Sequence, residues 1–158
     1  MSADVILIEF NNLRELSQSM PGVRVKKLAY FHSFMLLTGL AFENLIKGIL
    51  IGRCKTIVNQ ESIDTSHWGG KSGHGIEELA RKVTSISSDE SNLLKRLQES
   101  LIWGGRYPIP KTSGVYFANR DLLSLLPTDF VLINNLFLRL EGILTSEWEK
   151  RSETESRF

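Results

Sequence analysis

An all-α fold, an up-and-down bundle of about four to five helices, is predicted by three features of the sequence. Apolar residues recur at helical spacing in four segments, and no alternating strand pattern of useful length or internal repeat accompanies them. The length of 158 residues, with 42% hydrophobic and 23% charged residues, fits one compact globular domain. We therefore expect a single domain over residues 1–158, with a core at about 24–149 and a charged tail at 150–158.

The most apolar segment, Leu28–Ile51, is predicted to be the central helix of the bundle. Its second half has the i, i+3, i+4, i+7 pattern in Phe42, Leu45, Ile46 and Ile49. The segment is long enough to cross a bilayer, but it carries four side chains that are costly in hydrocarbon: His32, Glu43, Asn44 and Lys47. We therefore expect a core helix rather than a membrane span.

Three further helices are expected after it. The first places Ile76, Leu79, Ala80 and Val83 on one face. The second follows Ser87–Glu90, which fits a capping box, and carries Leu94, Leu97 and Leu101. The last is marked by Ile133, Leu136, Phe137, Leu140, Ile143 and Leu144, and is expected to fray after Trp148.

Shorter helices are expected at Leu7–Ser19, ending near Pro21-Gly22, and at Asp121–Leu126. The polar, glycine-rich segments Asn59–Gly75 and Gly104–Asn119 are predicted to be loops, and loops are the expected functional surfaces.

Charge and cysteine content restrict the function classes. Lys and Arg number 19 against 18 Asp and Glu, so a formal net charge of +1 provides no global field for a polyanion. Cys54 is the only cysteine, which excludes an internal disulfide and a cysteine-based zinc cluster and indicates a reducing compartment. The first ten residues read as a mature N-terminus, since they have no basic leader or cleavage site. A cytoplasmic protein without a cofactor is expected.

Three strings, taken in order, resemble the HEPN superfamily of small helical proteins over Arg24 to Glu149. They are Ala41–Lys47 in the central helix, Gly73–Leu79 opening the next, and Gly105–Pro108 closing the third. The resemblance implies a dimer-forming helical bundle from a group that includes toxins, antiviral defence proteins, CRISPR-associated ribonucleases and partners of nucleotidyltransferases. Because fold alone does not assign function, the chemistry has to be examined residue by residue.

Ribonucleases of that superfamily carry an Arg, four to six intervening residues and a His near the subunit interface. This chain departs from that pattern, because Arg139 in the last helix is followed by no His in residues 140–146. Arg24 and His32 have seven residues between them, which places them on different faces of a helix. His32 is expected to be a core or interface histidine. Without a histidine beside the phosphate, acid/base cleavage lacks its usual agent.

His74 has two interpretations. The structural one is a cap on free N–H groups at the start of the helix that follows Gly73. The functional one places His74 near Arg106, a cation suited to phosphate, with a stacking face and added charge from Trp103, Tyr107 and Lys111. The structural alternative for Gly105–Pro108 is a helix stop. Glu43 and Asn44 would be costly if buried alone, so a partner such as Arg106 or a facing subunit is expected.

Other motifs lack support. Gly70-Lys71-Ser72 resembles the end of a P-loop, but Thr65 occupies the position of the first glycine. His67 and His74 lack the further ligands that a metal site needs, so they are expected to be solvated loop histidines and no metal is predicted. Cys54 has no identifiable base for nucleophilic catalysis.

Two functions remain. The first is a non-catalytic HEPN-like module that forms a homodimer and binds a protein partner, RNA or a nucleotide in a defence, toxin–antitoxin or regulatory system. The alternative is an atypical, metal-independent ribonuclease that uses His74 and Arg106.

Overall fold

The computed structural model describes residues 21–54, 68, 73–104 and 124–155. All regular structure in these ranges is helical, which confirms the predicted all-α bundle. The elements are α2 (Pro21–Arg53), α3 (Ile76–Val83), α4 (Ser88–Glu99), its π-helical continuation η4 (Ser100–Gly104) and α6 (Asp129–Glu155). The expected helix at Leu7–Ser19 and most of the two expected loops lie outside the described residues. Ser124–Leu126, the described part of the expected short helix, is not helical.

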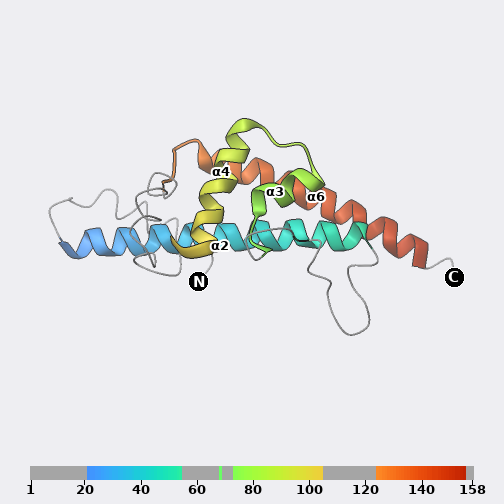
Figure 1. Ribbon diagram of the computed structural model, residues 1–158, viewed down its shortest axis with the longest axis horizontal. Coiled ribbons are helices and arrows are strands. Elements are labelled where there is room, and N and C mark those ends of the chain that lie inside the picture. The colour runs from blue at the N-terminus through green and yellow to red at the C-terminus, as the bar shows by residue number, and fades with distance from the viewer. Residues whose placement is uncertain (1–20, 55–67, 69–72, 105–123, 156–158) are drawn as a thin grey trace.

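The long helices α2 and α6 lie side by side and run in the same direction (Figure 1). Phe130 at the start of α6 packs against Phe34 in the middle of α2, with ring centroids 5.7 Å apart, and further along Phe42 meets Phe137 at 5.8 Å. Close approach continues toward the C-terminal ends, where a Cβ on Gly48 would lie 3.2 Å from a methyl carbon of Leu144.

The helices that lie between α2 and α6 in the sequence, α3 and α4, pack on one side of this pair. α3 follows the direction of α2, since the residue before it, His74, contacts Glu43 and its last residue, Val83, contacts Arg53. α4 runs the other way, and η4 brings Leu101 against Gly39 of α2. Directions therefore do not simply alternate along the described part of the chain.

The core is built from the apolar positions that helical spacing marks. Every predicted core position of α2 and α3 is buried, as are the leucines of α4 and η4 and two positions of α6: Phe42, Leu45, Ile46, Ile49, Ile76, Leu79, Ala80, Val83, Leu94, Leu97, Leu101, Leu136 and Leu140. Ile133, Phe137, Ile143 and Leu144 are partly buried and pack against this core. A stripe of apolar side chains at this spacing buries one face of each helix, which is what holds the bundle together.

Helix α4 begins as predicted. Ser87 is its N-cap, its hydroxyl accepts from Glu90 N at 3.2 Å, and the Glu90 carboxylate accepts from Ser87 N at 2.8 Å. This reciprocal pair is a capping box, which satisfies two backbone donors that no helical carbonyl can reach.

The start of α6 was not predicted in detail. Asp129 is fully buried, and its carboxylate accepts from Leu126 N at 2.6 Å, while Pro127 has no N–H to satisfy. The far end also differs from the prediction, because α6 continues to Glu155 instead of fraying after Trp148. Local contacts hold this last part, among them Arg151 over the Trp148 ring at 5.5 Å and Ser152 Oγ donating to Glu149 O at 2.9 Å.

One segment of α2, Leu28–Arg53, is long and apolar enough by length and composition to cross a membrane. Half of its most apolar window is buried inside the bundle. A core helix of a water-exposed domain passes the same test.

Candidate functional site

A cluster of ionisable side chains joins α2 to the turn before α3. Glu43 and Lys47 are one helical turn apart on α2, and Lys47 Nζ lies 2.5 Å from Glu43 Oε1. The other oxygen, Oε2, lies 2.8 Å from His74 Nδ1. Trp68 completes the group, because Lys47 Nζ sits 4.3 Å from the centroid of its ring. We call Glu43, Lys47, Trp68 and His74 the Glu43 cluster.

The backbone on either side of His74 makes this contact possible. Gly73 has φ +80°, a conformation that side chains other than glycine rarely adopt. A Cβ there would be in ordinary van der Waals contact with the cluster, 3.7 Å from Lys47 Nζ and 3.9 Å from Trp68. Gly73 and Gly75 are both buried, so the turn lies directly on α2.

The prediction that His74 caps α3 is wrong. The N-cap of α3 is Gly75, which makes no side-chain capping bond, and Ile76 N donates to the backbone oxygen of His74 at 2.9 Å. The His74 side chain turns toward α2 instead, where the buried Glu43 carboxylate accepts from a ring N–H, whereas the start of α3 offers only N–H donors. His74 Nδ1 and the Glu43 carboxylate therefore form a charge-assisted hydrogen bond.

Glu43 is 6% exposed, and its partners explain how a carboxylate is tolerated there. Burial, the largest single effect, raises its pKa, whereas hydrogen bonds and charge from Lys47 and His74 lower it, with a net pKa below the ordinary value of 4.5. The carboxylate is consequently ionised at neutral pH. The expectation that Glu43 needs a partner was correct in kind, but the partners are Lys47 and His74. Asn44, named with it, is exposed and needs none.

Of the residues expected to bind a ligand, only His74 can be placed. Arg106, Tyr107 and Lys111 lie outside the described residues, as do the side chain of Trp103 and His67. Neither Lys47 nor Trp68 was predicted from the sequence to be a site residue. The Glu-Lys spacing of four residues was a usable signal for the first, whereas the contact between Glu43 and His74 joins residues 31 apart and leaves no local pattern.

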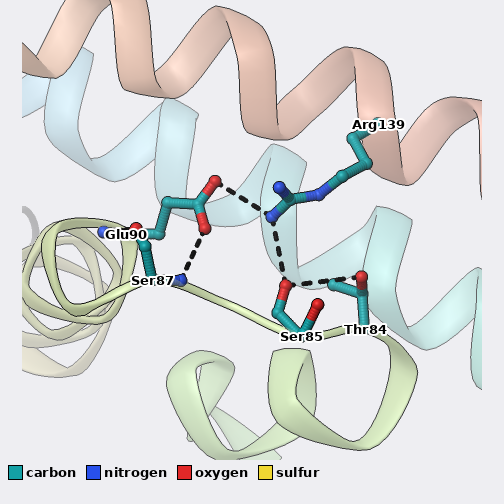
Figure 2. A network of polar contacts seen from close by, with 5 residues as sticks. All are labelled: Thr84, Ser85, Ser87, Glu90 and Arg139. Carbon is teal, nitrogen blue, oxygen red and sulfur yellow. Dashed lines mark hydrogen bonds and ion pairs between the residues drawn. The ribbon is translucent and has the colours of Figure 1, made fainter.

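A second polar network ties α6 to the turn between α3 and α4 (Figure 2). Arg139 reaches down from α6, and its Nη2 donates to Glu90 Oε1 at 2.9 Å and to Ser85 O at 3.3 Å. The other oxygen of Glu90 serves the capping box. The pKa of Glu90 is lowered because the hydrogen bonds of Ser87 and Arg139 outweigh burial, which raises it. Arg139, the arginine at the expected motif position, is thus engaged in holding helices together.

A third ionic contact is more deeply buried. Arg96 Nη2 donates to Asp129 Oδ1 between α4 and the start of α6, and the side chains are 9% and 0% exposed. A cavity of about 150 Å³ opens beside them, lined by Asp89, Asn92, Arg96, Leu126, Thr128, Asp129 and Leu132. Arg96 Nε is buried and has no hydrogen-bond partner among the described atoms. The spacing of α4 gave no signal for this pair, because Arg96 lies between core leucines.

His32 is half-buried in α2, as expected of a core histidine. Its ring lies edge-on to Phe31 at 5.3 Å, and burial lowers its pKa. Among the described residues, no group of three or more His, Cys, Asp or Glu side chains is arranged to hold a metal ion.

No family model, curated protein or solved structure matches the chain.

Proposed function

We propose that this chain is a non-catalytic, HEPN-like interaction module. The observation that carries the proposal is the engagement of Arg139. In a ribonuclease of the resembled superfamily, the last helix presents an arginine and a following histidine to the scissile phosphate. Here Arg139 is bound to the Glu90 carboxylate and to Ser85 O, and α6 contains no histidine. A guanidinium neutralised by a partly buried carboxylate is a poor phosphate ligand.

Binding is supported by apolar side chains that the described bundle does not cover. Val131 and Leu138, seven residues apart on one face of α6, are 63% and 56% exposed, and Leu37 of α2 is 36% exposed. Exposed apolar side chains at this spacing are typical of helix pairing between subunits. We propose a second copy of the chain as the first partner. The setting, a cytoplasmic defence, toxin–antitoxin or regulatory system, is suggested by the resemblance alone.

The test is an RNA cleavage assay with the purified protein. An interaction module leaves single-stranded RNA and transfer RNA intact, with or without divalent metal, and any weak cutting persists in His74→Ala. Arg139→Ala, which leaves the Glu43 cluster untouched, gives the same result. Cleavage that disappears in His74→Ala, while helicity and melting stay at wild-type values, would exclude the proposal.

The alternative, an atypical metal-independent ribonuclease using His74 and Arg106, is favoured by one observation. A carboxylate oriented against one ring nitrogen of a histidine is how acid/base histidines are held in many enzymes. In that case replacing His74 or Arg106 lowers turnover by roughly 10²-fold or more. The double variant is little worse than either single one, because the two groups serve one step.

A further inference from the structure

The hydrogen bond between His74 and Glu43 has a defined direction. An ionised carboxylate can only accept, so the hydrogen between Glu43 Oε2 and His74 Nδ1 belongs to the ring. The second carboxylate oxygen is occupied by Lys47 at 2.5 Å, so the carboxylate cannot rotate without breaking a second contact. Whenever the ring is neutral, its proton is therefore on Nδ1, and Nε2 has a lone pair.

His74 is also accessible. Its side chain is 27% exposed, whereas that of Glu43 is 7% exposed. Because the Nδ1 edge faces the buried carboxylate, we infer that the exposed area belongs mainly to the rest of the ring. The turn at Gly73 fixes the backbone of His74, and Glu43 fixes the ring through Nδ1. Together these two contacts determine where Nε2 lies.

We propose that Glu43 and His74 form a proton-accepting pair, in which Glu43 is a positioning residue and His74 Nε2 receives an O–H or N–H donor of a bound ligand. A purely structural pair would fasten the turn to α2 but would not need an accessible Nε2.

The charges of the cluster indicate which ligands suit it. Glu43 and Lys47 cancel, and the ammonium of Lys47 is already shared between that carboxylate and the Trp68 ring. The cluster therefore has no cation available to neutralise a phosphate, so the donor belongs to a group of low negative charge, such as a hydroxyl or an amide. This inference is independent of the proposed function, because it predicts the state of one ring whether or not RNA is bound.

The test uses the full chain and two readouts. Long-range ¹H–¹⁵N spectra report which ring nitrogen carries the proton, with the His74 signals assigned from a His74→Asn variant. Diethyl pyrocarbonate reports whether Nε2 is accessible. An unprotonated Nε2 attacks a carbonyl carbon of the reagent, and an N–C bond forms as ethyl carbonate leaves. The acylated ring loses its other N–H proton, and ethyl carbonate takes up a proton and decomposes to ethanol and carbon dioxide. Peptide mapping then compares His74 with the half-buried His32.

In the wild type we expect a proton on Nδ1 and faster modification of His74 than of His32. Glu43→Gln offers a single carbonyl oxygen to two donors. If Lys47 keeps that oxygen, the amide N–H₂ faces the ring, and the proton must move to Nε2. We therefore expect a change of tautomer and a loss of His74 modification. Glu78→Gln, on the first turn of α3 with a side chain 61% exposed, should change neither readout.

Two results would overturn the proposal. A proton on Nε2 in the wild type would show that Glu43 does not orient the ring. Modification of His74 only after denaturation would show that Nε2 is covered and that the pair only fastens the turn. The second result needs no variant, so the proposal stays testable if Glu43→Gln fails to fold.

Discussion

Among single residues, three glutamates show how partly buried carboxylates are retained in this bundle. Glu43, Glu77 and Glu90 each accept hydrogen bonds from at least two groups, and each has a pKa below its ordinary value. For Glu77 the largest cause is the hydrogen bond from Ser91 Oγ, at 2.7 Å. The same contacts that make burial tolerable thus favour the charged form.

The lowered pKa values predict that stability is lost in acid. A carboxyl whose folded pKa lies below its unfolded value contributes stability above the unfolded value, near 4.5 for these groups. That contribution falls as the pH drops through the folded pKa, because the unfolded chain binds more protons in that interval. Urea unfolding at a series of pH values should show a stability that is constant with respect to these groups above pH 4.5 and decreases progressively below it.

Glutamate-to-glutamine variants show which carboxylates cause the loss of stability in acid. Glu90→Gln removes one group that takes up a proton on unfolding, so its stability should fall less steeply with decreasing pH than that of the wild type. Glu78→Gln, at an exposed carboxylate, should keep the wild-type slope. Equal slopes in all three proteins would contradict the assignment to Glu90.

At the level of the helices, hydrophobic spacing predicted most of what the structure contains. The core face of α3 was correct at all four positions, and the capping box of α4 was correct in both hydrogen bonds. These features are local, because a helix period and a four-residue cap are written in adjacent residues. The end of α6 was missed, since the expected fraying took no account of the contacts around Trp148 and Arg151.

The candidate site was less predictable from the sequence than the helices. His74 was identified, but its partner on α2 was not, and the buried pair of Arg96 with Asp129 joins residues 33 apart. Pairing between distant residues depends on how the helices cross. A single sequence carries no local signal for such crossings.

The capping box gives a prediction with a matched control two residues away. Ser87→Ala removes the hydroxyl that accepts from Glu90 N and should lower the free energy of unfolding by about 1 kcal/mol. Ser85→Ala should have little effect, because Ser85 is exposed and its backbone oxygen, which the substitution keeps, is the atom that accepts from Arg139. Urea unfolding compares the two variants, and an equal loss in both would count against a specific role of the cap.

Close helix crossing gives a second prediction at this level. A Cβ on Gly39 would lie 2.9 Å from Leu101 Cγ and 3.2 Å from the backbone oxygen of Leu97. Gly39→Ala should therefore force α2 away from η4 and destabilise the protein by about 1–3 kcal/mol. On α6, a Cβ on Gly142 would meet nothing within 4 Å. Gly142→Ala should instead stabilise by up to about 1 kcal/mol, since alanine favours a helix. Thermal melting of both variants distinguishes crowding from helix propensity.

Considered as a whole, the described molecule is a pair of long parallel helices with the shorter helices packed on one side (Figure 1). This arrangement buries the faces of α2 and α6 that meet each other and the shorter helices. It leaves Leu37, Val131 and Leu138 at the surface. Their exposure is the structural reason to expect association, and it places the expected contact on the long helices.

The resulting prediction is a homodimer that depends on the exposed face of α6 that carries Val131 and Leu138. At tens of micromolar, where an interface with a Kd of about 1 μM is mostly occupied, sedimentation should show a dimer. Leu138→Glu places a charge on the face and should shift the protein to monomer without changing its helicity, because Leu138 is 56% exposed and contributes little to the core. Leu28→Glu is the matched control. Leu28 is 57% exposed but lies nine residues from Leu37, on the opposite side of α2, so its substitution should leave the dimer intact. A wild-type protein that stays monomeric at this concentration, or a Leu138→Glu variant that remains a dimer, would rule out pairing through this face.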